Sequence, residues 1–363
     1  MSCSYVLQIQ DIMKILINAP SFKILGGVAR HYLGLNDYWS ENVRFNAIGN
    51  RNIVPGHGIF WVPCDIVKFM ARLLTFRPDV IVVNPSLGAN ALWRDFLFMN
   101  IAQAMGFKVI IFLHGFDFDY AKKINKNWAV KNFNKASLIF VLARRFKDIM
   151  QGWGVTTPIR LTTTKVDDKL VKGFDIVKER DFTKRNILFL SRLENAKGIY
   201  EAVDTYAILK QKYSDITLSF VGDGTESDAL KQYVADKGLQ DVRFTGRLSG
   251  EALVNEYKAA NFFLFSSHGE GMPAAVLEAM AFGLPVFTRT VGGLVDFFEN
   301  DKMGYITDSL DPKDFAAAMV PYLESPELTK QVSLYNAEYA KKHFMASSVA
   351  RQIENTIKET IGI

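Results

Sequence analysis

The sequence predicts an α/β protein of two domains, each a doubly wound parallel β-sheet covered by helices on both faces. The chain has 363 residues, and a domain typically holds about 150, which favours two domains over one. Short apolar, β-branched segments alternate with longer segments of helical periodicity, the pattern of a parallel sheet covered by helices. This pattern starts afresh near residue 187, after the polar, glycine-containing segment 169–185, which has the composition of a linker.

The expected strands divide into two sets of five. In the first half they cover residues 14–18, 43–48, 80–84, 109–113 and 138–142. In the second half they cover residues 187–190, 216–221, 242–245, 262–265 and 285–288. Ligands of such folds bind at the carboxyl ends of the strands, so the loops after the strands are where functional residues are expected. A last amphipathic helix is expected from about residue 346 to 361, packed back on the first domain.

The composition excludes several classes of protein. Hydrophobic residues make up 49% and charged residues 22% of the chain, which excludes a disordered, collagen-like or simple coiled-coil protein. The only cysteines, Cys3 and Cys64, form neither a disulfide scaffold nor a C-x-x-C pair, so a cytoplasmic location is expected. No apolar segment approaches the roughly 20 residues that span a bilayer. Residues 1–12 lack the features of a signal peptide, and we expect them to be a dispensable extension or translation to start at Met13.

The net charge of +5 conceals two halves of opposite sign. Residues 1–180 carry 24 Lys and Arg against 13 Asp and Glu (+11), and residues 181–363 carry 19 against 25 (−6). Within the basic half, segment 61–77 has helical periodicity and places Lys68, Arg72 and Arg77 beside apolar residues. Either this helix rests on an anionic membrane surface or its apolar side packs in the core, which is the commoner outcome. No nucleic acid partner is expected, because no recognised binding motif accompanies the charge.

Several common motifs are absent. No G-x-G-x-x-G follows an expected strand, since the nearest match, Gly222-Asp-Gly224, lacks the third glycine, and no P-loop occurs. These absences disfavour a dehydrogenase and a P-loop NTPase. The D-x-D of Asp117 and Asp119 is a spacing that some transferases use for a metal nucleotide, but it arises often by chance. The histidines show no H-x-x-x-H pairing, and we predict no metal site.

The most informative segment follows the expected strand 262–265. Glu270 lies between two glycines, and Pro273 suits the first turn of a helix, where free N–H groups attract anions such as phosphate. Glu278 lies further along this helix among alanines, and a carboxylate in such surroundings needs hydrogen-bond donors. The vicinal hydroxyls of a ribose or a hexose are suitable donors.

A second segment, 191–198, follows the first strand of the second half. Arg192 offers a planar fork and Lys197 a point charge, and together they can neutralise a diphosphate. Taken alone, each segment is as well explained by a surface loop and a solvent-facing helix. Because both follow strands of one parallel sheet, they favour a nucleoside diphosphate ligand.

These segments resemble a known family. The E-x7-E spacing inside EGMPAAVLEAMAFGLPV, together with SRLENAKG, GDG and FTGRLS, resembles glycosyltransferase family 4, whose members are retaining enzymes of the GT-B fold. The resemblance implies two Rossmann-like domains facing a central cleft: an acceptor-binding domain over residues 1–168 and a nucleotide-sugar donor domain over residues 169–345, with helix 346–363 packing back on the first. The first domain matches more loosely, through Gly26-Gly27 and His114-Gly115.

The resemblance also implies a role for each site residue. Glu278 would hold the ribose hydroxyls of the donor and Glu270 the hydroxyls of the transferred sugar. Arg192 and Lys197 would bind the diphosphate and stabilise it as a leaving group. His114 would contact the donor sugar from across the cleft, although a lone histidine after a buried strand is often structural. Backbone groups of Gly271, Met272 and Pro273 would line the sugar and the phosphate. Gly27 would let the first-domain loop close on the phosphates or the acceptor.

The implied function is a retaining, metal-independent glycosyltransferase without a cofactor. It would move a hexose-type sugar from a UDP-, GDP- or ADP-sugar to a glycan or lipid-linked acceptor, in cell-surface polysaccharide or glycolipid synthesis. In this family the acceptor is thought to attack from the front face while the departing phosphate assists its deprotonation, so no carboxylate nucleophile is required. The chain departs from the family pattern at Ser191, where a glycine is usual, and at residues 163–168, where N-G-V-D is usual and only Val166 and Asp167 fit.

Two other functions fit the same observations. One is a nucleotide-sugar epimerase or a sugar-phosphate-forming enzyme of the same fold, which an acceptor-independent change in the sugar would identify. The other is a catalytically silent sugar-nucleotide binding protein, which would bind the nucleotide and yield no product.

Overall fold

The computed structural model describes residues 12–22, 26–48 and 62–363. The chain divides into two compact units. Unit 1 comprises Met1–Val141, Lys147–Arg160 and Ala350–Ile363, and unit 2 comprises Leu142–Phe146 and Leu161–Val349. No helix among the described residues is long and apolar enough to cross a membrane.

Unit 1 is built on a six-stranded sheet in the order β2-β1-β3-β5-β7-β8, in which the paired strands whose register is defined run parallel. The central strands are buried along nearly their entire length, because helices cover both faces of a parallel sheet. A short parallel pair, β4 with β6, lies outside this sheet. The strands are β1 (Lys14–Pro20), β2 (Asn42–Ile48), β3 (Val80–Val83), β4 (Ser86–Leu87), β5 (Lys108–Leu113), β6 (Gly115–Phe116), β7 (Leu138–Val141) and β8 (Ile159–Leu161).

The helices of unit 1 follow the strands in alternation, as the sequence predicts. The expected helix 61–77 is α2, and its Phe69, Leu73 and Phe76 are buried. The helices are α1 (Gly27–Leu35), α2 (Val62–Phe76), α3 (Ala89–Ala104), α4 (Phe118–Lys123) and α5 (Lys126–Phe133), with a 3₁₀ turn η1 (Asn36–Tyr38). A further helix, α6 (Arg144–Gly152), begins in unit 2 and belongs to unit 1 from Lys147 onward.

The last helix, α14 (Ala346–Ile361), carries a buried face that repeats every three or four residues, and from Ala350 onward it belongs to unit 1. Its Glu354 is 2% exposed and accepts hydrogen bonds from Ser40 N (2.8 Å), Ser40 Oγ (2.6 Å) and Glu41 N (2.9 Å). The end of the chain is therefore joined to the beginning of β2 by a buried carboxylate.

Unit 2 contains a second six-stranded parallel sheet, in the order β11-β10-β9-β12-β13-β14. The chain adds β10 and β11 on one side of β9, then returns and adds β12 on the other side. The order of the strands therefore reverses between β9 and β12, and this is the position where doubly wound sheets bind ligands. The strands are β9 (Asn186–Leu190), β10 (Thr217–Val221), β11 (Val242–Phe244), β12 (Phe262–Phe265), β13 (Val286–Arg289) and β14 (Gly304–Thr307).

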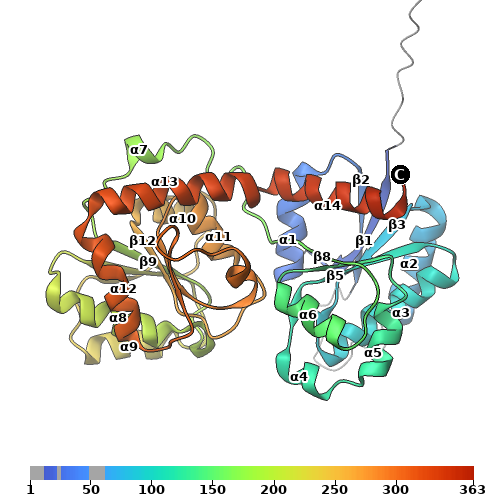
Figure 1. The fold of residues 1–363 in the computed structure, drawn as a ribbon, viewed down its shortest axis with the longest axis horizontal. Helices are drawn as coiled ribbons and strands as arrows, with labels where there is room; N and C mark the ends of the chain where they lie inside the picture. Colours follow the sequence, from blue (N-terminus) through green and yellow to red (C-terminus); the bar gives the residue numbers. More distant parts are fainter. Residues whose placement is uncertain (1–11, 23–25, 49–61) are drawn as a thin grey trace, which may run out of the picture. The chain divides into compact units, whose positions relative to one another are not determined.

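The sheet of unit 2 buries a hydrophobic core on each face, because successive strand residues point to opposite sides. Ile187 and Phe189 join a core with α8, α9 and α12, whereas Leu188 joins a core with α10, α11 and α13. Figure 1 shows these two groups of helices on opposite sides of the strands. The helices are α7 (Ile176–Glu179), α8 (Ile199–Lys212), α9 (Ser227–Asp236), α10 (Gly250–Ala259), α11 (Ala274–Ala281), α12 (Pro312–Glu324) and α13 (Pro326–His343), with 3₁₀ turns η3 (Asn195–Lys197) and η4 (Gly292–Asp296).

The division between the units differs in detail from the predicted boundary after Asp168. It falls between Arg160 and Leu161, and the expected linker 169–185 lies entirely within unit 2. Most residues of that segment are exposed or partly exposed, but Arg180 is 6% exposed, and its Nη2 donates to the carbonyls of Phe282 (2.8 Å) and Tyr257 (3.3 Å). The guanidinium of Arg180 therefore anchors an otherwise solvent-exposed polar segment to the ends of two helices.

Candidate functional site

The loops after β9 and β12 meet where the strand order of unit 2 reverses. Lys197, in the loop after β9, donates from Nζ to Oε1 of Glu270, in the loop after β12, at 2.6 Å. Both side chains are mostly buried, with 16% and 18% of their surface exposed. The structure thus brings together two of the predicted site residues that lie 73 residues apart in sequence.

The close approach of these loops depends on Gly198. Its φ is +72°, and a Cβ at this position would lie 2.1 Å from the carbonyl oxygen of Ser266. Any side chain would push the two loops apart, because this neighbour is backbone and cannot rotate away. The hydroxyl of Ser266 also donates to the carbonyl of Gly198 (2.6 Å), which joins the loops directly.

The carboxylate of Glu270 is held through one oxygen. Oε1 accepts hydrogen bonds from both Lys197 Nζ (2.6 Å) and Ser267 Oγ (2.9 Å). Oε2 makes no hydrogen bond with any residue in the described part of the chain. A carboxylate oxygen can accept more than one hydrogen bond, so Glu270 can receive a ligand hydroxyl on Oε2 while the first oxygen stays fixed.

Glu278 lies on α11 and is partly buried. Its Oε2 accepts a hydrogen bond from the hydroxyl of Tyr257 at 2.8 Å. Tyr257 is fully buried and stacks on Phe282, with ring centroids 4.9 Å apart. Burial and the neighbouring carboxylate raise the pKa of Tyr257, so it remains a neutral donor. The hydrogen bond from Tyr257 therefore offsets part of the cost of placing the Glu278 carboxylate among alanines, and it orients that carboxylate.

Arg192 lies in the same loop as Lys197 but is mostly exposed. Its guanidinium pairs with Glu194, two residues further along the chain. An exposed pair of this kind is worth little energetically, so the guanidinium can leave it for a phosphate. Ser191, which stands where the family has glycine, is accommodated here, with its hydroxyl donating to the carbonyl of Arg192 (2.8 Å).

The GDG segment supports the Arg192 loop. A Cβ on Gly222, whose φ is +143°, would lie 1.8 Å from the carbonyl oxygen of Ser191. Leu193 N donates to the carbonyl of Asp223 (3.1 Å), which ties this loop to the one after β10. The side chain of Asp223 accepts from Gly224 N (2.9 Å) and Ser227 Oγ (2.7 Å) at the start of α9. This segment, which resembled part of a dinucleotide motif, therefore serves to position the neighbouring loop.

Residues 271–273 connect Glu270 to α11. The carbonyl of Gly271 accepts from Gly293 N (2.8 Å), and the side chain of Met272 packs close to Gly293. Pro273 precedes the first residue of α11 and so lies one position before the first turn expected from the sequence. In the described part of the chain, Ala274 N and Ala275 N make no hydrogen bond. Their N–H groups are thus available to an anion at the start of this helix.

His114 and Gly27 belong to unit 1. His114 directly follows β5, stacks on Phe112 with ring centroids 3.8 Å apart, and its Nε2 lies 3.0 Å from Asn84 Oδ1. It is partly exposed, and its packed surroundings lower its pKa to about 3, so it is neutral at physiological pH. Gly27 is the exposed first residue of α1, and a Cβ added there would meet no atom of the described residues within 4 Å, so packing among these residues does not require glycine.

Two other patterns of the sequence have structural explanations. Asp117 caps α4, its side chain accepting from Asp119 N and Tyr120 N at 2.9 Å, and Asp119 pairs with Lys122 on the surface. Local capping thus accounts for the D-x-D spacing. In segment 163–168, Val166 is buried and bridges Met345, while Asp168 accepts from Ser347.

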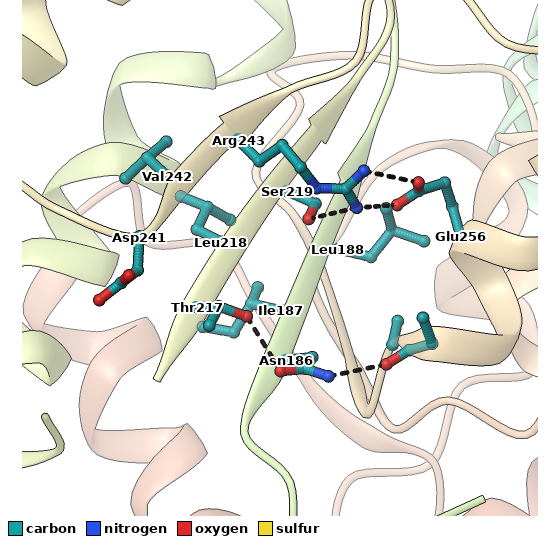
Figure 2. A pocket seen from close by; sticks show the side chains of 12 residues that line it. Asn186, Ile187, Leu188, Thr217, Leu218, Ser219, Asp241, Val242, Arg243 and Glu256 are labelled. Carbon is teal, nitrogen blue, oxygen red and sulfur yellow. Dashed lines mark hydrogen bonds and ion pairs between the residues drawn. The ribbon is translucent and has the colours of Figure 1, made fainter. Parts of the chain in front are cut away.

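One pocket of unit 2 lies away from this site. A cavity of about 300 Å³ is lined by the amino-terminal parts of β9, β10 and β11 and by α10, at the opposite ends of the strands from Lys197 (Figure 2). Its polar side chains are paired with one another: Arg243 with Glu256, and Thr217 with Asn186. Oε2 of Glu270 and the N–H groups of Ala274 and Ala275 lie instead at the carboxyl ends of the strands, which makes that edge the candidate site.

Sequence reasoning missed three residues at this site. Tyr257 lies in α10, far from Glu278 along the chain, and no local pattern marks it. Ser267 donates a hydrogen bond to Glu270, and its position directly before the glycine loop is the one sequence feature that points to this role. His268 approaches Glu201 of α8, with Nε2 2.8 Å from Oε1, and its N–H donates to the carbonyl of Ala196 (2.9 Å). The contacts of Tyr257 and His268 are tertiary, whereas Ser267 lies three residues from Glu270 in the same loop.

The chain is similar in sequence to several curated glycosyltransferases. It is 28% identical over 226 residues to D-inositol 3-phosphate glycosyltransferase of Corynebacterium jeikeium, covering 58% of this chain and 54% of the relative. It is 28% identical over 181 residues to mannosylfructose-phosphate synthase of Agrobacterium fabrum, covering 47% of this chain and 40% of the relative. The matched part thus spans about half the length of these relatives or less.

Solved structures share the fold over nearly the whole chain. Anabaena HepE in complex with UDP and glucose superposes with a TM-score of 0.73 at 20% identity, covering 95% of this chain and 99% of that one. Sucrose-phosphate synthase from Thermosynechococcus elongatus gives a TM-score of 0.76 at 17% identity, covering 96% and 99%. The predicted α/β class, with two Rossmann-like units of the GT-B type, is confirmed. Residues 174–341, which make up most of unit 2, match the family model described as Glycosyl transferases group 1.

Proposed function

We propose that this protein is a retaining glycosyltransferase of family 4 that transfers a hexose-type sugar from a nucleoside diphosphate sugar to a glycan or lipid-linked acceptor. The observation that carries this proposal is the pairing of Lys197 with Glu270 at the strand-order reversal of unit 2. The pair places the ammonium group of Lys197, which can bind phosphate, beside the carboxylate of Glu270, which can accept hydrogen bonds from sugar hydroxyls. The match of residues 174–341 to the group 1 family model supports the same chemistry.

The donor occupies the carboxyl edge of the unit 2 sheet in this proposal. Glu278, oriented by Tyr257, accepts the ribose hydroxyls, and Glu270 accepts hydroxyls of the transferred sugar on Oε2. Arg192 leaves its surface pair with Glu194 and, with Lys197, binds the diphosphate. Residues 271–273 line the sugar and the phosphates. Support for a nucleotide sugar comes from HepE, whose structures contain UDP, UDP-glucose, or UDP and glucose.

The transfer step requires charge stabilisation more than a nucleophilic side chain. The bond between the sugar C1 and the phosphate oxygen breaks, the acceptor oxygen bonds to C1 on the same face, and the acceptor proton passes to the departing phosphate. Arg192 and Lys197 stabilise the negative charge that develops on the diphosphate, which is preorganised electrostatic catalysis. We propose that neither a metal nor a cofactor takes part.

A nucleotide-sugar screen tests this proposal. UDP-, GDP- and ADP-sugars are compared for thermal stabilisation of the protein and for slow hydrolysis, and the donor that stabilises it is then incubated with candidate acceptors. We expect one nucleotide to raise Tm and the new glycosidic bond to keep the anomeric configuration of the donor. Inversion of configuration would contradict the retaining assignment. A sugar changed without acceptor would favour an epimerase, and binding without any product would favour a silent binding protein.

For the acceptor side we propose that unit 1 binds an anionic membrane surface through α2, at the cytoplasmic face. At 100° per residue, the exposed apolar residues of α2 form one continuous arc opposite its buried residues. Val67 is 66%, Leu74 63% and Met70 39% exposed. Lys68 and Arg72 adjoin this arc and are exposed, so cationic groups border the apolar surface. The helix thus uses one face for the core and presents a second apolar face.

Liposome co-sedimentation tests this membrane proposal. The protein should sediment with vesicles containing phosphatidylglycerol and stay in solution with phosphatidylcholine alone. The double variant Val67→Glu/Leu74→Glu should lose at least about tenfold in vesicle binding, since each substitution removes an apolar anchor and adds repulsion. Val177→Glu, at an exposed apolar residue of unit 2, serves as the control and should bind normally. Equal sedimentation with both lipids, or self-association through α2 in ultracentrifugation, would overturn the proposal.

A further inference from the structure

A buried amide lies at the centre of the polar network at the carboxyl edge of the unit 1 sheet. Asn84, directly after β3, is 2% exposed, and its side chain contacts groups from three other elements. Oδ1 accepts from the hydroxyl of Tyr32 on α1 at 2.5 Å and lies 3.0 Å from Nε2 of His114 after β5. Nδ2 donates to the carbonyls of Asn18 (3.1 Å) and Val82 (3.4 Å).

The two carbonyls fix the orientation of this amide. A backbone carbonyl only accepts hydrogen bonds, so the atom of Asn84 that faces Asn18 O and Val82 O must be the NH₂ group. The reverse orientation would place three oxygens against one another in a buried site, at a cost of several kcal/mol. Oδ1 therefore faces Tyr32 and His114, and an amide oxygen can only accept from both.

It follows that His114 must donate to Asn84. A neutral imidazole carries its proton on one nitrogen only, and here that nitrogen is Nε2 because its partner is an acceptor. Nδ1 then holds a lone pair. In the described part of the chain, Nδ1 makes no hydrogen bond, so this lone pair is available at the strand edge.

We propose that Asn84 and Tyr32 are positioning residues that hold His114 as the Nε2–H tautomer, so that its Nδ1 accepts a hydrogen bond from a hydroxyl of the sugar substrate. Tyr32 contributes by occupying the second lone pair of Asn84 Oδ1, which fixes the amide in place. Stacking on Phe112 holds the plane of the ring. The low pKa of His114 agrees with this arrangement, since protonation would place a charge in a packed site. The substrate contact rests on the proposed function, whereas the tautomer does not.

Long-range ¹H–¹⁵N correlation NMR of the protein labelled at histidine tests the tautomer without any substrate. His114→Gln assigns the signals. In the parent protein His114 should show the Nε2–H pattern alone between pH 5 and 8. In Asn84→Leu, which removes the acceptor, the Nδ1–H pattern or a titrating ring should appear, and in Tyr32→Phe the Nε2–H pattern should persist. An Nδ1–H or protonated His114 in the parent protein would overturn the proposal.

Two substitutions at His114 test the substrate contact. The side-chain oxygen of His114→Asn lies near the position of Nδ1 and can still accept, whereas His114→Gln keeps only a donor near the position of Nε2. We expect His114→Asn to keep kcat/KM for transfer within about threefold and His114→Gln to lose about tenfold, the worth of one hydrogen bond. The opposite order would refute the contact and leave the tautomer result standing. Absence of transfer in the parent protein would instead count against the proposed function.

Discussion

Nζ of Lys197 donates to Oε1 of Glu270 at 2.6 Å, across the line where the strand order of unit 2 reverses. Each residue comes from a loop that the sequence marks separately. Their pairing supplies a polar, mostly buried pair at the edge where doubly wound sheets bind ligands.

Lys197→Ala should abolish detectable transfer and leave the protein folded. Loss of a group that stabilises developing charge on a leaving diphosphate costs about 10²- to 10³-fold in kcat. Product formation and circular dichroism measure the two effects. Lys210→Ala is the matched control, because Lys210 pairs with Asp241 at 2.7 Å with a similarly buried amine but lies away from the site. Full activity in Lys197→Ala would remove this residue from the site.

Glu278→Ala should likewise abolish transfer, because the donor ribose loses its acceptor. Tyr257→Phe should raise KM for the donor about tenfold with a smaller effect on kcat, since it removes the hydrogen bond that orients the carboxylate. Steady-state kinetics over a range of donor concentrations separates these effects. Tyr213→Phe breaks another 2.8 Å tyrosine–glutamate bond, to Glu324, and should leave both constants unchanged. If the two tyrosine variants behave alike, Tyr257 has no specific role.

Gly198→Ala should destabilise the protein by more than about 2 kcal/mol and weaken nucleotide binding. A positive φ costs a non-glycine residue about 1 kcal/mol, and the clash with the Ser266 carbonyl adds to it. Gly238→Ala provides the comparison, because Gly238 has a φ of +61° with no atom within 4 Å of its Cβ position. Urea unfolding measures the free energy of unfolding of both variants. An equal decrease in the free energy of unfolding of the two variants would show that the close contact between Gly198 and Ser266 contributes nothing to stability.

Glu354→Ala should destabilise unit 1 by about 3 kcal/mol. The substitution leaves Ser40 N, Ser40 Oγ and Glu41 N without their buried acceptor, and each unsatisfied donor costs about 1 kcal/mol or more. Differential scanning calorimetry should show a lower Tm while nucleotide binding by unit 2 persists. The exposed Glu299 provides a control, and Glu299→Ala should change stability little. An unchanged Tm in Glu354→Ala would mean that α14 is not needed to hold unit 1 together.

Most of the secondary structure follows from periodicity. The strand expected over residues 262–265 is β12, and the last helix matches α14 as expected. The sequence pattern does not predict four strands: β4, β6, β8 and β14. Each has only two to four residues, and β8 and β14 lie at sheet edges, so their apolar pattern is weak. The polar, glycine-containing composition of segment 169–185 predicts a linker, but the segment belongs to unit 2, where the guanidinium of Arg180 donates to buried carbonyls.

The sequence by itself determined the two parallel-sheet units, the loops that carry Lys197, Glu270 and Glu278, and the basic and acidic halves of the chain, because periodicity and residue type are local properties. Only the tertiary structure decided which loops meet. The return of the chain from β11 to pair β12 with β9 brings Glu270 to Lys197. Packing of α10 against α11 brings Tyr257 to Glu278, and convergence of strand ends brings Asn84 to His114. These contacts join residues far apart in sequence, and strand order, which no local pattern encodes, sets them.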